Sequence, residues 1–238
     1  MASRTVAILL VDHDQELIDL LAFGLRRAGL QPVAARDPAD ALHCFEQHRP
    51  EVVVLDTNLG ASSALEVLKQ VRRRGEAPVI MLSALHSEEQ AVRLLEAGAD
   101  DYVTKPFSHR ELIARIRAQL RRTSQARTAP PGSDAGLQVG SLILDPAAQS
   151  VIKAGKPVRL TVTEFRLLHY LVANAGKAVP IDELLKQVWG YQDSYGTDVV
   201  RVTVHRLRRK LEYDPSRPRI LRTILGMGVQ LGPDTETV

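Results

Sequence analysis

Four polar side chains stand at the ends of short runs that are typical of strands. Asp12 follows residues 7–11, Asp56 follows residues 52–55, Ser83 follows residues 78–82, and Lys105 follows residues 101–104. Two carboxylates, a hydroxyl and an ammonium together could supply a nucleophile and ligands for a metal. The carboxylate of Asp56 comes directly after an uninterrupted apolar run, Val-Val-Val-Leu. This position predicts chemistry at Asp56.

Helical patterns lie between these runs and determine how they are arranged. Leu17, Leu20, Leu21 and Leu25 recur at helical spacing after the first run, and residues 65–71 continue the pattern after the run that ends at Asp56. The alternation of strand and helix predicts a parallel sheet wrapped by helices, a doubly wound α/β domain. Ligand sites in such sheets form outside the carboxyl ends of the strands, so we expect the four polar residues to meet at one edge.

Length and composition indicate a folded protein with two domains. The chain has 238 residues and a hydrophobic content of 45%, which together allow two cores and exclude a disordered chain. Cys44 is the only cysteine, so no intrachain disulfide can form, which fits a reducing compartment. The apolar run of residues 6–11 is too short for a secretion signal or a membrane span. We therefore expect a cytoplasmic protein that does not enter a membrane.

Positive charge is concentrated in the second half of the chain. Residues 1–122 carry 16 Lys and Arg against 17 Asp and Glu, whereas residues 123–238 carry 15 against 11. Residues 199–222 alone hold eight basic and two acidic residues, which indicates a phosphate-rich partner. Residues 123–136 offer little to bury and predict a linker. The expected domains are therefore residues 1–122 and residues 137–238.

A basic amphipathic helix is predicted between Asp198 and Glu212. Its apolar stripe consists of Val200, Val204, Leu207 and Leu211. At about 100° per residue, the other side chains form a basic surface that suits the major groove of DNA. There Arg can bind guanine edges, and small apolar groups can meet the thymine methyl. The residues that we expect to contact DNA are Arg201, Val202, Thr203, His205, Arg206, Arg208 and Arg209.

Several stretches of the first half follow a known pattern. They are Asp56 at its strand end, Ser83 with Ala84, residues 98–107 and residues 110–117. In this order they closely resemble the receiver domain of bacterial two-component response regulators, and the resemblance covers residues 5–122. It implies a five-stranded parallel sheet in which Asp56 accepts a phosphoryl group from a histidine kinase.

The resemblance also assigns roles around Asp56. Lys105 would provide the ammonium that offsets phosphoryl charge, and the bond between Lys105 and Pro106 would be cis. Ser83 would donate a hydrogen bond to a phosphate oxygen, and Tyr102 would follow it inward as an aromatic switch.

A divalent metal site beside Asp56 is implied by the same resemblance. Its ligands would be Asp12, Asp56 and the backbone carbonyl of Asn58, and the expected ion is Mg²⁺. The family usually has two adjacent acidic residues after the first strand, but the second of these positions is His13 here. Mg²⁺ prefers hard oxygen ligands, so an imidazole weakens its binding. Two alternatives remain open: His13 points to solvent, or it is a ligand that makes Mn²⁺ the better ion.

The second half follows a family pattern as well, in residues 160–168, residues 188–190 and residues 206–211. These stretches resemble the winged-helix effector domain of the OmpR/PhoB subfamily over residues 137–231. The resemblance implies an α+β domain with four short strands, three helices and a terminal hairpin, the wing. Residues 199–212 would be the recognition helix. Leu225, Val229 and Gln230 replace residues of the family that are usually Arg, Tyr and Arg, so we expect weaker wing contacts with DNA.

Receivers of this family pair through charged residues across a two-fold axis when they are active. Asp101 with Arg115, and Asp100 with Arg122, match two of these pairs. Glu111 would meet a basic residue, but that position is Ala91 here. Because exposed ion pairs contribute little singly, we expect a weaker homodimer rather than none.

The resulting prediction is a two-component response regulator, not an enzyme, that binds double-stranded DNA under control of phosphorylation at Asp56. Its partners would be a histidine kinase and a second copy of the chain, with RNA polymerase as a further candidate. One alternative keeps the fold but makes DNA binding independent of phosphorylation, because His13 alters the metal site. A third hypothesis, a phosphohydrolase with Asp56 as nucleophile, is disfavoured because Asn58 stands where such enzymes need a second Asp.

Overall fold

The structure is a computed structural model that describes residues 6–59, 61–84, 88–127, 137–146, 148–190 and 197–232. The described side chains exclude those of residues 61–63, 88 and 121–127. The chain divides into two compact units, residues 1–120 and residues 121–238. Within the described parts, no helix combines the length and the apolar character that crossing a membrane requires.

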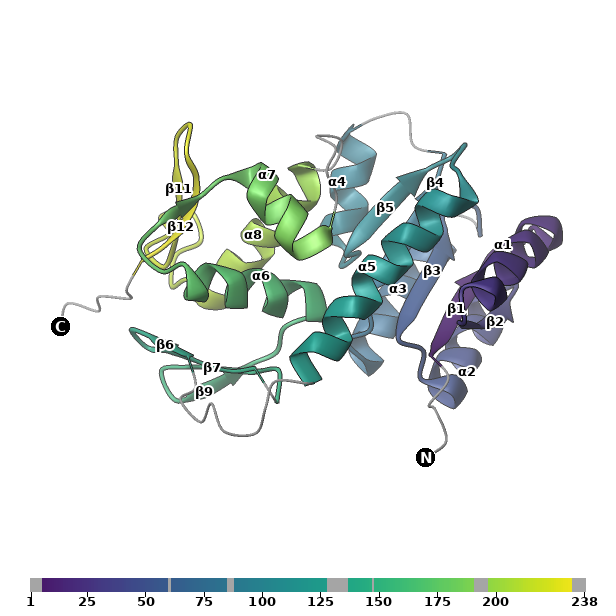
Figure 1. The fold of residues 1–238 in the computed structure, drawn as a ribbon, viewed down its shortest axis with the longest axis horizontal. Helices are drawn as coiled ribbons and strands as arrows, with labels where there is room; N and C mark the ends of the chain where they lie inside the picture. The colour runs from purple at the N-terminus through teal and green to yellow at the C-terminus, as the bar shows by residue number, and fades with distance from the viewer. Residues whose placement is uncertain are drawn as a thin grey trace. The chain divides into compact units, whose positions relative to one another are not determined.

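The first unit is built on a five-stranded parallel sheet, as the sequence predicts. The strands are β1 (Ala7–Val11), β2 (Gln31–Ala35), β3 (Val52–Asp56), β4 (Val79–Ser83) and β5 (Asp101–Thr104), in the order β2-β1-β3-β4-β5. The helices between and after them are α1 (Gln15–Arg27), α2 (Pro38–His48), α3 (Ala61–Arg74), α4 (Glu88–Glu96) and α5 (His109–Arg127). In Figure 1, α1 and α5 pass in front of the sheet and α3 lies behind it. The doubly wound α/β prediction is therefore confirmed.

Covering on both faces explains why the central strands are apolar throughout. Every residue of β1, β3 and β4 is buried, which is the pattern of parallel strands packed between helices. On one face, alternate strand residues pack with Leu21 and Leu25 of α1 and with Leu112 and Ile116 of α5. Leu20, which the sequence pattern placed on the buried face of α1, is instead 52% exposed.

Helix α5 is longer than the sequence indicates. It ends at Arg127, so residues 123–127, which were predicted to begin the linker, are helical. The rest of the predicted linker, residues 128–136, lies outside the described residues. The peptide bond between Lys105 and Pro106 is cis, as expected.

The second unit has the α+β winged-helix architecture. An antiparallel sheet comes first, with strands β6 (Leu137–Val139), β7 (Leu142–Asp145), β8 (Ser150–Lys153) and β9 (Lys156–Val158). Three helical segments follow: α6 (Val162–Ala173), α7 (Ile181–Leu184) continued by the π-helical turn η1 (Leu185–Trp189), and α8 (Thr197–Leu211). Strand β10 (Ala178–Val179) pairs with the terminal hairpin of β11 (Leu221–Ile224) and β12 (Gly228–Leu231). This arrangement confirms the second predicted fold.

Local chemistry sets the ends of these elements. The Thr161 hydroxyl accepts the N–H of Glu164, and the Glu164 carboxylate accepts the N–H of Thr161, which forms a capping box at the start of α6. Gly228 lets the hairpin approach β10, because a Cβ at this position would lie 1.9 Å from the carbonyl oxygen of Val179. The wing is thereby fixed against the body of its unit.

Candidate phosphoacceptor site and nucleic-acid interface

The parallel sheet brings the predicted polar residues to one edge. Asp56 and Ser83 are the last residues of the adjacent strands β3 and β4, while Asp12 directly follows β1 and Lys105 directly follows β5. Lys105 Nζ lies 3.0 Å from Asp56 Oδ1 and 3.3 Å from Asp12 Oδ2. Three side chains from three strand ends therefore form one charged cluster, with carboxylates on both sides of the ammonium.

The Asp56 carboxylate is completely buried, and its charge is costly there. Asp56 is 0% exposed and Asp12 only 2% exposed. Burial raises the pKa of Asp56 most strongly, the hydrogen bond from Lys105 opposes that rise, and the nearby charge of Asp12 adds to it. The Lys105 ammonium therefore offsets part of the cost of ionising Asp56, and the ionised carboxylate is the form that can act as a nucleophile.

His13 also belongs to this cluster. Its Nδ1 lies 3.3 Å from Asp12 Oδ1 and 3.8 Å from Asp56 Oδ2. One atom each of Asp12, His13 and Asp56 could hold a metal ion, since these atoms lie within 4.8 Å of one another. Asn58, the other expected ligand, is an exposed residue of the turn after β3. Of the two open alternatives for His13, this placement fits the one in which the imidazole is turned toward the carboxylates.

Asp14 has a different task from its acidic neighbours. Its side chain caps α1, because Oδ1 accepts the N–H groups of Glu16 at 2.9 Å and Leu17 at 3.2 Å. The backbone N–H of Asp14 donates to Asp12 Oδ1 at 3.0 Å. Asp14 thus fixes the loop after β1 and orients Asp12.

Ser83 and Tyr102, the two predicted switch residues, lie on neighbouring strands. Ser83 is 3% exposed, and its hydroxyl accepts a hydrogen bond from the Thr57 hydroxyl at 3.1 Å. Tyr102 is partly buried on β5, in register with Met81 of β4. Thr57 was not among the predicted residues, although its hydroxyl directly follows Asp56 in the sequence. The hydrogen bond from Thr57, the residue after Asp56, therefore links the end of β3 to the Ser83 hydroxyl at the end of β4.

The basic helix α8 exposes only some of the residues predicted to contact DNA. Arg201, His205 and Arg209 are exposed and recur every four residues, so they form one outward line. Val202 and Thr203 are instead 7% and 2% exposed, and Thr203 Oγ1 donates to the carbonyl of Val199 at 2.6 Å. The buried side of α8 is wider than the four-residue stripe that the sequence indicated.

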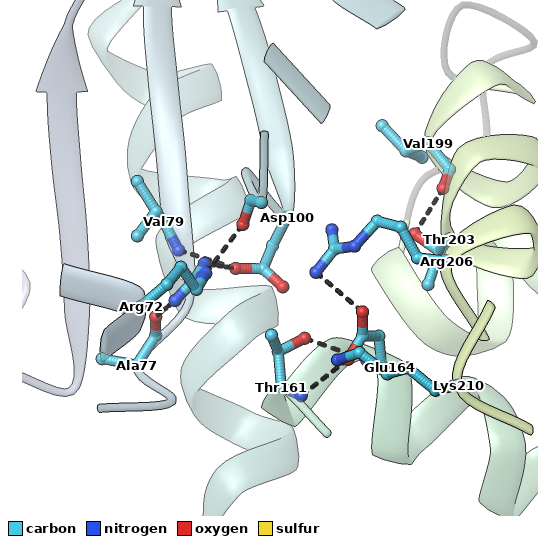
Figure 2. Close-up of polar contacts among 11 residues, drawn as sticks. Arg72, Ala77, Val79, Asp100, Thr161, Glu164, Val199, Thr203, Arg206 and Lys210 are labelled. Carbon is cyan, nitrogen blue, oxygen red and sulfur yellow. Dashed lines mark hydrogen bonds and ion pairs between the residues drawn. The ribbon is translucent and has the colours of Figure 1, made fainter. Parts of the chain in front are cut away.

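Arg206 is bound to a buried carboxylate within its own unit. Its Nη2 lies 2.8 Å from Glu164 Oε1, and Lys210 Nζ lies 2.6 Å from Glu164 Oε2 (Figure 2). Glu164 is 0% exposed, so the two cations neutralise a fully buried charge that also caps α6. The Thr-x-x-Glu pattern predicts the cap, but nothing in the sequence predicts these two partners.

Arg208 connects α8 to the wing. It donates from Nε to the carbonyl of Leu221 at 2.8 Å and from Nη2 to the hydroxyl of Thr223 at 2.7 Å. Burial lowers the pKa of Arg208, and the nearby charge of Glu212 opposes this change. Farther along the hairpin, Gln230 donates to the carbonyl of Gly176 at 2.5 Å. Arg208 was predicted to contact DNA from its place on the basic helix, and Gln230 was predicted to weaken the wing contacts; here both bond the wing to the rest of its unit.

The predicted dimer pairs are occupied within the chain. Asp100 is buried and accepts from the guanidinium of Arg72 and from the N–H of Val79, the latter at 2.9 Å (Figure 2). The pairing of Asp100 with Arg122 of a second subunit stays a prediction, since the side chain of Arg122 lies outside the described residues. Arg115 lies 3.4 Å from Asp101 and 2.9 Å from Glu111 of the same chain.

Comparisons with known proteins give a consistent result for both units. Residues 8–117 match the response regulator receiver domain, and residues 155–231 match the C-terminal domain of transcriptional regulatory proteins. DrrB of Thermotoga maritima, an OmpR/PhoB homologue, is 32% identical in an alignment that covers 96% of this chain and 99% of DrrB, with a TM-score of 0.50. A mutant of RitR is 22% identical in an alignment that covers 95% of this chain and 98% of the RitR chain, with a TM-score of 0.74. At that identity, the RitR structure shows a shared fold alone.

Proposed function

Because the chain belongs to the OmpR/PhoB family of response regulators, which are DNA-binding transcription regulators and not enzymes, we propose that phosphorylation of Asp56 by a histidine kinase controls its binding to DNA. One observation carries this proposal. The carboxylate of Asp56 is 0% exposed, yet it lies 3.0 Å from the Lys105 ammonium at the carboxyl edge of the sheet. A buried carboxylate whose ionised form is stabilised by a lysine is equipped to be a nucleophile.

The proposed reaction moves one phosphoryl group. An oxygen of Asp56 attacks the phosphorus of the kinase phosphohistidine, an O–P bond forms, and the N–P bond breaks, so that the histidine leaves and an acyl phosphate remains. Lys105 offsets the negative charge of the phosphoryl oxygens, which are the main charge that this reaction must stabilise. Ser83 then donates a hydrogen bond from its hydroxyl to a phosphoryl oxygen, and it can keep the bond that it accepts from Thr57, because a hydroxyl accepts and donates at the same time.

A divalent ion fits the same pocket. Asp12, Asp56 and the carbonyl of Asn58 would hold it, because two carboxylates that are 2% and 0% exposed need positive charge beyond a single ammonium. When bound, Mg²⁺ or Mn²⁺ would neutralise phosphoryl oxygens and help to align them. Lys105 would keep its position on the opposite carboxylate oxygens.

DNA binding would use a narrower set of residues than the sequence indicated. The outward line of Arg201, His205 and Arg209 is available to the major groove, since all three side chains are exposed on α8. Arg206 and Arg208 would act by holding α8 against α6 and the wing. We therefore propose that the first three residues read or grip DNA and that the other two position them.

A receiver homodimer would connect phosphorylation to DNA binding. Of the two predicted pairs, Asp101 with Arg115 is the better supported, although Arg115 already bonds Asp101 and Glu111 in its own chain. If these bonds were exchanged between subunits, the number of ion pairs would stay the same. The ion pairs would therefore add little to the free energy of dimer formation. Ala91, which is 2% exposed, offers no cation to Glu111. We accordingly expect weak pairing, supported mainly by adjacent half-sites on DNA.

Phosphorylation-independent DNA binding is the second candidate function. The observation that favours it is His13, which stands where the family supplies a second metal-binding acid. The hydrolase hypothesis is excluded by membership of a non-enzyme family and receives no support from Asn58.

Selection of bound DNA from a random pool, with and without acetyl phosphate and a divalent ion, tests the proposal. We expect tandem or inverted half-sites to be enriched, and more strongly after acetyl phosphate treatment. A matched selection with Asp56→Ala should be insensitive to acetyl phosphate. Equal enrichment under every condition would favour the second candidate, and enrichment of single half-sites alone would contradict the dimer.

A further inference from the structure

The two buried carboxylates divide their oxygens between two different partners. Asp12 Oδ2 and Asp56 Oδ1 face the ammonium of Lys105, at 3.3 Å and 3.0 Å. Asp12 Oδ1 and Asp56 Oδ2 face Nδ1 of His13, at 3.3 Å and 3.8 Å. The imidazole therefore sits beside the oxygens that Lys105 leaves available, and the three atoms enclose a position that a small cation could occupy.

Asp56 supplies a second, independent reason to place a ligand there. Its Oδ2 is buried and accepts no hydrogen bond from the described residues. An ionised oxygen that is buried and accepts no hydrogen bond is costly. Asp12 Oδ1 has one donor, the N–H of Asp14 at 3.0 Å, which leaves a lone pair for another partner. A cation between Oδ1 of Asp12 and Oδ2 of Asp56 would give both oxygens a partner that offsets their charge.

The nature of the third ligand decides which cation is bound. Mg²⁺ is a small, hard ion that takes oxygen ligands almost exclusively. Imidazole nitrogen binds Mn²⁺ weakly and then with rising strength through Co²⁺ and Ni²⁺ to Cu²⁺, with Zn²⁺ also bound firmly. In octahedral coordination at about 2.1 Å, adjacent ligand atoms lie about 3 Å apart. The observed 3.3 Å and 3.8 Å need only a small contraction to reach that spacing.

We propose that Asp12, His13 and Asp56 form a site for an imidazole-binding transition-metal ion of the series from Mn²⁺ to Zn²⁺, which binds there in preference to Mg²⁺. This inference rests on the proposed function, because the ion occupies the pocket in which Asp56 would be phosphorylated. Its consequence is a dependence of the receiver on the supply of such an ion. Asn58 and water complete the coordination shell, and Lys105 remains on the opposite oxygens.

Metal titration of the full chain tests the inference. Dissociation constants for Mg²⁺ and Co²⁺ are measured by calorimetry on the unaltered protein, on His13→Asp, and on His43→Asp as a control at another exposed histidine. We expect the ratio of the Mg²⁺ constant to the Co²⁺ constant to fall by about tenfold or more in His13→Asp, since even indirect partners of a metal change affinity by about tenfold or more. His43→Asp should leave the ratio unchanged.

NMR spectra of the same samples test directly whether His13 binds the metal. Addition of Zn²⁺ should shift the ring resonances of His13 in NMR spectra, and the shift should be absent in Asp12→Asn. An unchanged Mg²⁺ to Co²⁺ ratio in His13→Asp, together with unmoved His13 resonances, would overturn the inference. Phosphoryl incorporation at Asp56 with Mg²⁺ would still uphold the proposed function in that case, so the two can fail separately.

Discussion

Burial of the Asp56 carboxylate controls the chemistry at the scale of single residues. A carboxylate with no exposure resists ionisation, and its raised pKa has burial as the first cause. Lys105 supplies the opposing charge from a different strand end, 3.0 Å away. His13 and Asp12 complete the cluster, with His13 Nδ1 3.3 Å from Asp12 Oδ1. Each of these residues is unremarkable alone, and the proposed acceptor site depends on their meeting at one edge of the sheet.

The sequence located these residues well because strand ends are visible in it. Apolar runs that stop at Asp12, Asp56 and Ser83 place those side chains without knowledge of loop geometry. The orientation of His13 toward both carboxylates was left open, because it depends on the turn that Asp14 stabilises by capping α1. Thr57 was missed for a related reason: its bond to Ser83 joins two strands, and one strand alone does not reveal it.

His169 in the effector unit provides a prediction about pH. Its ring stacks on Phe165 with centroids 6.1 Å apart, and burial lowers its pKa from 6.5. The unfolded chain therefore binds a proton at His169 more readily than the folded chain does. Its contribution to the free energy of unfolding is complete above about pH 6.5 and declines as the pH falls toward the lower folded value.

Urea unfolding monitored by Trp189, the only tryptophan and a fully buried one, measures this effect. We expect the loss of stability between about pH 7.5 and about pH 5.5 to be smaller for His169→Gln than for the unaltered protein. Equal losses in the two proteins would show that the folded and unfolded chains protonate His169 alike.

At the scale of elements, α8 separates its basic residues into two groups. Arg201, His205 and Arg209 point outward, whereas Arg206 and Arg208 hold α8 to α6 and to the wing. The helix and its amphipathic pattern could be predicted from residues 198–212 alone. The division could not, because Glu164 lies 46 residues from Lys210 in the sequence and Thr223 lies 15 residues beyond Arg208.

Paired substitutions on α8 test this division. Arg209→Ala should weaken DNA binding and reduce the slope of log affinity against log salt by about one, while the urea midpoint stays unchanged. Arg206→Ala should lower the free energy of unfolding by about 1–3 kcal/mol, because Glu164 loses one of two charged partners while 0% exposed. Lys210 remains on the other oxygen and limits the loss.

Arg209→Ala should therefore change mainly the DNA affinity, and Arg206→Ala should change mainly the free energy of unfolding. If Arg206→Ala weakened DNA binding as much as Arg209→Ala and left the urea midpoint unaltered, Arg206 would be a direct DNA contact. The positioning role assigned to it from Glu164 would then be wrong.

At the scale of the whole molecule, a receiver domain and a winged-helix domain are joined in one chain. The winged-helix domain can respond to the receiver only if the receiver changes its chemical state. In the proposed function, phosphorylation of Asp56 is the local charge event that supplies this change. We propose the same domain bounds as the sequence predicts, residues 1–122 and 137–238. Helix α5 continues past the first domain as far as Arg127. Asp100 is bound to Arg72 of the same chain, and its pairing with Arg122 across a dimer stays a prediction.

The affinity for a selected DNA site, measured before and after treatment with acetyl phosphate and a divalent ion, tests phosphorylation control most directly. Intact mass of the same samples records whether one phosphoryl group was added. We expect the phosphorylated protein to bind the site more tightly, and Asp56→Ala to gain neither mass nor affinity. Modification of Asp56 that left the affinity unchanged, or an affinity gain that persisted in Asp56→Ala, would contradict control through this residue.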